Sequence, residues 1–182
     1  EIGVRLVGSE MCIRDSSILD PEVTGGDNTG LLAIHSLSKT SNLASYRAGW
    51  IAGDEKLVQE LLLVRKHAGL MVPGPIQHAM VAALNDDTHE QLQKSLYANR
   101  RLVLLKALTE AGFTVDHSEA GLYLWARREG LDGRGSLDWL AERGILAAPG
   151  DFYGPAGAGH VRVGLTAADD RVAEAARRIT AQ

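Results

Sequence analysis

The sequence predicts an α/β protein, made of part of one α/β domain followed by a small α+β domain. Two observations predict this class. A short apolar run over 31–37 ends in a cluster of polar residues, and residues 113–179 alternate strand-like and helix-like segments. Between them, a helical pattern of about seven turns at 3.6 residues each runs from Asp87 to Gly112, long enough to connect two domains. We therefore expect one domain over 17–95 and a second over 96–182.

The first domain begins with turn-rich sequence and two short strands. The apolar stretches 31–37 and 48–53 predict these strands on either side of the polar cluster. Asp54 is a suitable N-cap for the helix that follows, and Gly69 is placed to end it. Pro75 fits the first turn of another helix, because proline is tolerated there without loss of a hydrogen bond. This order predicts strand, polar turn, strand and two helices.

The long helix and the second domain carry their own boundary signals. Asp87 and Glu90 have the spacing of a capping box, and so do Thr166 and Asp169, with aspartate in the usual place of glutamate. The apolar patterns of the second domain predict strands over 113–116, 121–127, 145–150 and 160–166, and helices over 136–144 and 167–179. This alternation favours a small sheet with helices packed on it.

Composition excludes several kinds of partner. The formal charge is −4 over 182 residues and the basic residues are scattered, so we expect no nucleic-acid partner. No apolar run approaches the roughly 20 residues of a membrane helix, so we expect no membrane partner. Cys12 is the single cysteine and no histidine pair has ligand spacing, so we expect no metal site and a cytoplasmic location.

The first sixteen residues have neither a strand nor a helix pattern. The segment 1–16, EIGVRLVGSEMCIRDS, does not begin with methionine and is similar to translated adapter sequence. We expect it to be non-native, and the chain to be the C-terminal fragment of a longer protein.

The polar cluster over 35–49, HSLSKTSNLASYRAG, combines an amine, a guanidinium and several hydroxyls where a strand ends. Open α/β folds place their chemistry at such positions. The Lys39 amine can react with a carbonyl group, while Ser36, Ser38 and Arg47 can hold a phosphate by charge-assisted hydrogen bonds. Pyridoxal phosphate needs both an amine for its aldehyde and an anion site for its phosphate. For any one of these residues alone, a solvated loop is the alternative.

The spacing within this cluster resembles the lysine motif of the class I and II aminotransferases of fold type I. Ser36-Leu37-Ser38-Lys39 followed by Tyr46-Arg47-Ala48-Gly49 carries the resemblance, although Ser45 replaces a more usual glycine. The stretches AGLYLWA at 120–126 and PGDFYGPAGAGHVRVGLT at 149–166 are similar to segments of the family's small domain.

The resemblance implies roles for individual residues. Lys39 would hold pyridoxal phosphate and move the α-proton of the substrate, and Ser36, Ser38 and Arg47 would bind the phosphate. Arg162 would bind the substrate α-carboxylate; without the resemblance, an edge-strand arginine that points to water is the alternative. The family's aspartate on the pyridine nitrogen would lie upstream of Lys39, where no suitable carboxylate is found. We therefore expect this fragment to be inactive alone.

Within the family, the sequence is most similar to bacterial N-succinyldiaminopimelate aminotransferases. This implies amino-acid and keto-acid substrates, glutamate as the amino donor, a place in lysine biosynthesis and a homodimer when the chain is full length. Several alternatives stay open. Other amino acid aminotransferases, carbon–sulfur lyases and non-catalytic regulatory domains share the same fold. The Ser-x-x-Lys pattern at Ser36 to Lys39 also occurs in enzymes that transfer acyl groups to serine.

Overall fold

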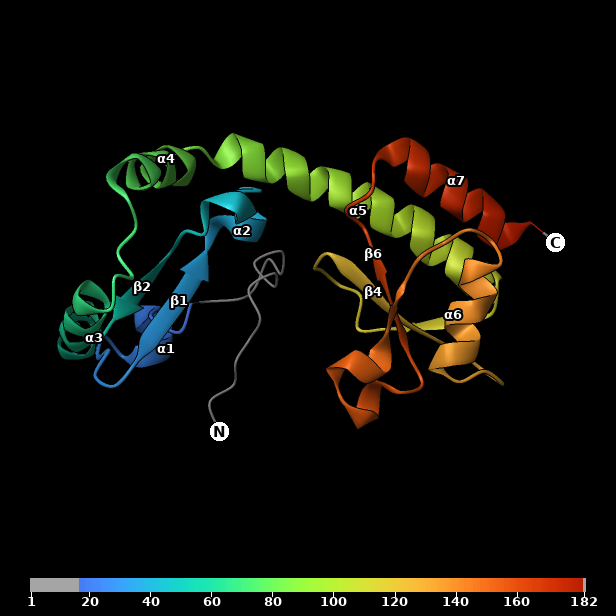
Figure 1. Cartoon of the computed structure of the whole chain (residues 1–182), viewed down its shortest axis with the longest axis horizontal. Coiled ribbons are helices and arrows are strands. Elements are labelled where there is room, and N and C mark those ends of the chain that lie inside the picture. The colour runs from blue at the N-terminus through green and yellow to red at the C-terminus, as the bar shows by residue number, and fades with distance from the viewer. Residues whose placement is uncertain (1–16, 182) are drawn as a thin grey trace. The chain divides into compact units, whose positions relative to one another are not determined.

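The computed structural model describes residues 17–181 of the chain (Figure 1). The segment 1–16, expected to be non-native, lies outside the described residues. The chain divides between Leu92 and Gln93 into two compact units. The division falls inside the helix α5 (Asp87–Glu110), so the long helix that was predicted is confirmed and contributes residues to both units.

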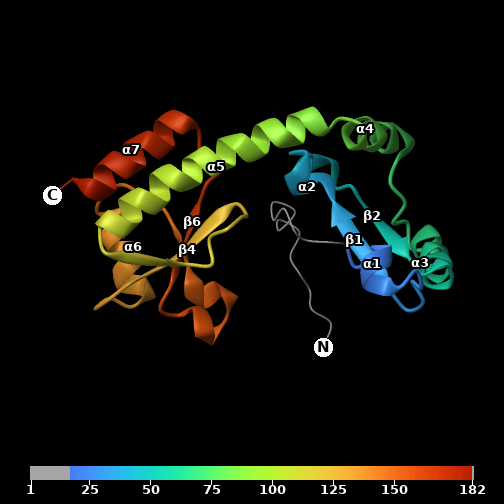
Figure 2. The same cartoon turned by 180° about the vertical axis from the view of Figure 1, so that it is seen from behind.

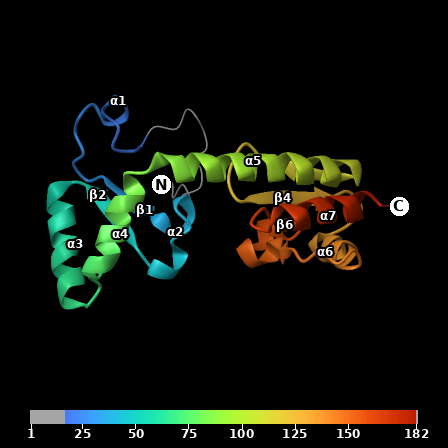
Figure 3. The same ribbon diagram turned by 90° about the horizontal axis from the view of Figure 1, so that it is seen from above.

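The first unit is built on a pair of antiparallel strands, β1 (Leu32–Ser36) and β2 (Gly49–Gly53). Their register places Ser36 opposite Gly49. Figure 3 shows α3 beside β2. The helices and turns of this unit are α1 (Pro21–Thr24), α2 (Leu37–Thr40), the 3₁₀ turn η1 (Ala44–Tyr46), α3 (Glu55–His67) and α4 (Gly74–Leu84).

Asp54 is the N-cap of α3, as its sequence predicts. Its Oδ1 accepts hydrogen bonds from the backbone N–H groups of Lys56 at 2.8 Å and Leu57 at 3.2 Å. Its Oδ2 accepts a third from Gly30 N at 2.7 Å, and this bond, followed by that from Leu57, lowers the pKa of the carboxyl. One side chain therefore fixes both the start of α3 and the loop that leads into β1.

The second unit is a sheet of antiparallel strands in the order β3-β4-β6-β5. Figures 1 and 2 show α7 running beside the C-terminal half of α5. The elements are β3 (Phe113–Asp116), β4 (Tyr123–Arg128), α6 (Gly133–Ala141), β5 (Ala148–Pro149), the 3₁₀ turns η2 (Gly150–Tyr153) and η3 (Pro155–Gly157), β6 (Val161–Gly164) and α7 (Asp169–Thr180).

One face of this sheet forms part of the core of the second unit. Alternate residues of β4 and β6 are buried, and the register pairs Leu124 with Val163 and Ala126 with Val161. The helices contribute buried apolar residues to the same core, among them Leu104 and Leu108 of α5, Leu140 of α6, and Val172 and Ile179 of α7. The other face carries Tyr123, Trp125 and Arg162, because side chains alternate along a strand.

Several predicted boundaries differ from the structure. The capping box at Thr166 and Asp169 is wrong, since α7 has no side-chain cap and Asp169 instead accepts a hydrogen bond from Arg100 Nε at 2.5 Å. At the start of α5, it is Asp86 whose Oδ1 accepts from Thr88 N at 2.9 Å. The helix predicted over 136–144 begins earlier, because the Asp132 carboxylate accepts from Gly135 N at 2.7 Å.

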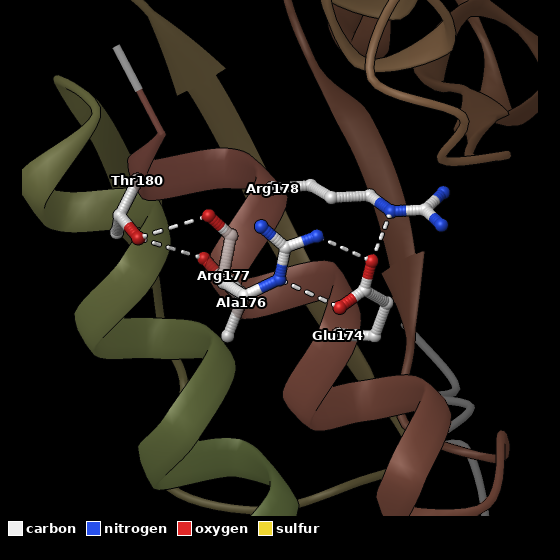
Figure 4. Close-up of polar contacts among 5 residues, drawn as sticks. All are labelled: Glu174, Ala176, Arg177, Arg178 and Thr180. Carbon is white, nitrogen blue, oxygen red and sulfur yellow. Dashed lines mark hydrogen bonds and ion pairs between the residues drawn. The ribbon is translucent and has the colours of Figure 1, made fainter.

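The last turns of α7 carry a small cluster of charges (Figure 4). Glu174 accepts hydrogen bonds from Arg177 at 2.7 and 2.8 Å and from Arg178 at 2.7 Å, and these bonds lower its pKa to about 2. Within residues 17–181, no helix combines the length and the apolar character needed to span a membrane.

Candidate active site

Ser36 links the end of β1 to the start of α2. Its Oγ accepts a hydrogen bond from Ser38 N at 3.2 Å and donates one to Ser38 Oγ at 3.0 Å. Thr40 Oγ1 donates to the backbone oxygen of Ser36 at 3.2 Å, and Leu37 is buried. The hydroxyl side chains of the motif therefore hold this short helix in place, which gives a structural reason for their number.

Arg47 has an unusual backbone conformation. Its φ is 51° and its ψ is 40°, in the left-handed region that residues other than glycine seldom adopt. The residue ends the turn η1, and its Nη1 donates a hydrogen bond to the Ala44 backbone oxygen at 3.1 Å. Strained backbone of this kind occurs more often at functional sites than elsewhere.

Gly49, two residues after the arginine, lies where the two strands approach each other closely. A Cβ at this position would lie 2.5 Å from the backbone oxygen of His35 on the neighbouring strand. The close approach of the two strands brings Ser36 and Arg47 to one pocket, with a volume of about 410 Å³. The rings of His35 and Trp50, which also line it, stack at 5.2 Å with an interplanar angle of 14°.

Lys39 lies on α2 and is exposed. Neither Lys39 nor Ser38 is among the residues that line the pocket shared by Ser36 and Arg47. The structure thus brings Ser36 together with Ser38 through a hydrogen bond and with Arg47 through a shared pocket. It does not bring the Lys39 side chain into that pocket.

Arg162 belongs to the second unit and lies on an internal strand. β6 pairs with both β4 and β5, so the alternative of an edge-strand arginine is wrong. The Cζ atom of Arg162 is 4.3 Å from the centre of the Tyr123 ring and 5.3 Å from that of Tyr153. Within the described part of the chain, no carboxylate forms an ion pair with it. The resemblance to the family implies a place for Tyr123 at the site, but Tyr153 was not among the predicted site residues.

A second contact at the motif has no signal in the sequence. His89 Nε2 lies 3.0 Å from the Oγ of Ser41, which follows α2 directly. The same ring is fixed by the Asp86 carboxylate, 3.2 Å from Nδ1. The pKa of Asp86 is lowered, first by the hydrogen bond from Thr88 N and then by that from His89. Because Ser41 and His89 are 48 residues apart, only the fold shows that they meet.

Comparison with known proteins places these features in a family. Residues 9–179 match the family of class I and II aminotransferases. The chain is 65% identical over 164 residues to the probable aminotransferase Rv1178 of Mycobacterium tuberculosis, covering 90% of this chain and 39% of that protein. It is 57% identical over 167 residues to the 4-dedimethylamino-4-oxo-anhydrotetracycline transaminase OxyQ of Streptomyces rimosus, covering 92% of this chain and 46% of that protein.

A solved structure gives the same result. The structure of a probable N-succinyldiaminopimelate aminotransferase from Thermus thermophilus is 30% identical and superposes with a TM-score of 0.72, over 85% of this chain and 42% of that one. The fold is therefore the α/β fold of the fold-type I transferases, as predicted, and the chain spans less than half the length of these relatives. The chain belongs to the class I and II aminotransferase family. This family depends on pyridoxal phosphate, which confirms the predicted cofactor.

Proposed function

We propose that the protein containing this chain is a pyridoxal-phosphate-dependent aminotransferase, in which Lys39 is the catalytic lysine. The observation that supports this most directly is the turn between β1 and β2. Ser36 ends the first strand, Arg47 adopts a left-handed backbone, and Gly49 allows the strands to approach closely enough for Ser36 and Arg47 to line one pocket.

The donor groups at this turn fit the chemical groups of the cofactor. Ser36, Ser38 and Arg47 supply two hydroxyls and a guanidinium, which suit a phosphate, and Lys39 supplies an amine for an aldehyde. When bound, pyridoxal phosphate supplies an electron sink for the α-carbon of the substrate. Lys39 Nζ would remove the α-proton and later donate it back, so the same amine would serve as the anchor of the cofactor and as the general acid and base. Arg162 binds the substrate α-carboxylate.

Replacement of Lys39 tests this assignment. In the full-length protein that carries this sequence, Lys39→Ala should abolish transamination and the borohydride-reducible absorbance band that forms on adding pyridoxal phosphate. Because the phosphate donors are intact, the variant should still bind the cofactor by equilibrium dialysis. Lys56 is an exposed lysine of α3, and Lys56→Ala serves as the control. This variant should keep both transamination and the borohydride-reducible absorbance band. Full turnover in Lys39→Ala would exclude Lys39 as the catalytic lysine.

For the substrates, we propose N-succinyl-L,L-diaminopimelate and 2-oxoglutarate, which exchange the amine to give the corresponding keto acid and glutamate. In the reverse direction glutamate is the amino donor to that keto acid. This proposal rests on the overall similarity of the sequence to that class and on the Thermus thermophilus structure of the same description. The 57% identity to OxyQ supports a second candidate, transfer of an amine to a polycyclic ketone. With glutamate as amino donor, assays that offer either the keto acid of N-succinyl-L,L-diaminopimelate or a polycyclic ketone as acceptor distinguish the two. Release of ammonia instead of a transferred amine would point to a lyase.

We also propose a homodimer for the full-length protein. In the first unit, α4 and the residues before it expose large apolar side chains, with Met71 50%, Val81 59% and Leu84 49% exposed. No residue of α4 is buried. Such a surface favours a protein partner. Sedimentation velocity with Val81→Asp, which should weaken the association of the full-length protein, tests this proposal.

A further inference from the structure

The face of the second sheet that lies opposite the core carries an arginine among aromatic rings. In the register of β4 and β6, Trp125 is opposite Arg162 and Tyr123 is opposite Gly164. Tyr123, Trp125 and Arg162 therefore lie on one face, and Tyr153 reaches the same place from the turn η2. The buried residues Leu124, Val161 and Val163 point to the other face.

The contacts of Arg162 are with rings rather than with acids. Its Cζ lies over Tyr123 at 4.3 Å and over Tyr153 at 5.3 Å, both within the range of a cation–π interaction. An aromatic ring contacts the plane of a guanidinium, whereas a carboxylate binds at its edge. The two tyrosines can therefore hold the group while its edge N–H donors stay available. They are 39% and 54% exposed, so a small anion can reach this region of the unit.

Tyr153 is itself held in place by its loop. Gly150 and Gly157 approach each other so closely that a Cβ on either would collide with the backbone oxygen of the other. The ring of Trp125 meets Tyr153 edge-on, with centroids 5.7 Å apart and an interplanar angle of 83°. Trp125 also stacks on His160 at 5.0 Å, with an interplanar angle of 10°. The loop and the strand thus fix the ring before any ligand arrives.

We propose that Tyr123 and Tyr153 are positioning residues for Arg162, and that they hold its guanidinium by cation–π contact so that its edge is ready for a carboxylate. The proposal rests on the proposed function, because it takes the substrate carboxylate as the ligand. Both contacts with Arg162 are made by the tyrosine rings and not by their hydroxyls. We therefore expect phenylalanine at either position to keep the positioning role, and leucine at either position to lose it.

The test uses the 182-residue chain labelled with ¹⁵N and sodium acetate as the probe. The Arg162 Nε–Hε signal, assigned by its loss in Arg162→Lys, is followed during titration. Ring currents should move this signal upfield in the wild-type chain and in Tyr123→Phe and Tyr153→Phe. The upfield shift should be smaller in each leucine variant, where one of the two rings is lost. The dissociation constant for acetate should rise about fivefold in each leucine variant, which corresponds to about 1 kcal/mol, and stay near the wild-type value in each phenylalanine variant.

Two controls separate a positioning role from a general loss of structure. Phe152→Leu removes a 73% exposed ring from the same loop and should leave the acetate titration unchanged. Acetamide, the neutral isostere of acetate, should produce no response. In the full-length protein, the leucine variants should raise the KM for the amino acid with little change in kcat, since only binding is weakened.

The outcomes for the inference and for the proposed function are distinct. Leucine variants that titrate like the wild type, or phenylalanine variants that lose affinity as the leucine variants do, would overturn the positioning role. A wild-type chain in which acetate leaves the Arg162 signal unmoved would overturn it as well. A normal acetate response in a full-length protein without transaminase turnover would overturn the proposed function and support the positioning role.

Discussion

Arg101 is a buried cation in the second unit, and its replacement should destabilise that unit. Its side chain leaves α5 and is only 7% exposed. Nη1 donates to Ser118 Oγ at 2.6 Å and Nη2 donates to the backbone oxygen of Gly121, so one guanidinium holds the loop before β4. Burial lowers the pKa of Arg101, and the negative charge of Glu119 opposes this effect.

The expected loss follows from these contacts. Each hydrogen bond to a charged group contributes about 1.5 to 3 kcal/mol, and removal of the charge also removes its desolvation cost. We expect Arg101→Met, which keeps the length of the side chain, to lower the free energy of unfolding by about 2 to 4 kcal/mol. Urea denaturation followed by tryptophan fluorescence measures this. A Trp50→Phe background leaves only Trp125 and Trp139, both in the second unit, as reporters.

A neighbouring position provides the control. Lys106 lies on the same helix with its side chain 77% exposed and forms a 3.9 Å ion pair with Glu110. Lys106→Met should change the free energy of unfolding by no more than about 0.5 kcal/mol, because exposed ion pairs contribute little. If Arg101→Met loses less than about 1 kcal/mol, or no more than the Lys106 variant, the structural role given to Arg101 is wrong.

Three further outcomes are expected. Gly49→Ala should destabilise the first unit by about 1 to 3 kcal/mol, because its Cβ would meet the His35 backbone oxygen at 2.5 Å. Gly74→Ala should be neutral, because a Cβ there has open space. Trp50 fluorescence reports both substitutions. Asp54→Ala should lower the midpoint of urea denaturation through loss of the α3 cap; an unchanged midpoint would contradict this. The pKa of Glu174 is lowered from 4.5 to about 2, so its contribution is complete above pH 4.5 and lost as the pH falls toward 2; Glu174→Gln should flatten the dependence of stability on pH in that interval.

The sequence predicts most of the local structure because the signals for it are local. The strands around the polar cluster, the Asp54 cap and the long helix all depend on residues within a few positions of one another. The failed capping box at Thr166 shows the limit of such patterns. There, Asp169 has the right spacing but binds Arg100, which is 69 residues away. The Asp169 carboxylate forms a tertiary ion pair instead of the backbone hydrogen bond that the local pattern predicts.

The candidate site shows the same difference between local features, which the sequence predicts, and long-range contacts, which it does not. The order of Ser36, Lys39 and Arg47 along the chain is enough to predict a phosphate and amine site, but not that Arg47 has a left-handed backbone or that Ser36 meets it in a pocket. The rings over Arg162 come from a strand and from a turn 30 residues apart, Tyr123 and Tyr153. Contacts of this kind depend on strand register and loop path, for which a single sequence carries no direct signal.

The close approach of Gly150 and Gly157 limits how the sequence of this loop can change in evolution. Each backbone occupies the space that the other residue's side chain would need. A single substitution at either position is therefore blocked, and substituting both would compound the clash instead of relieving it. The residues between the two glycines can therefore be substituted far more freely than the glycines themselves. We expect the backbone path of the loop to be retained while most of its sequence changes.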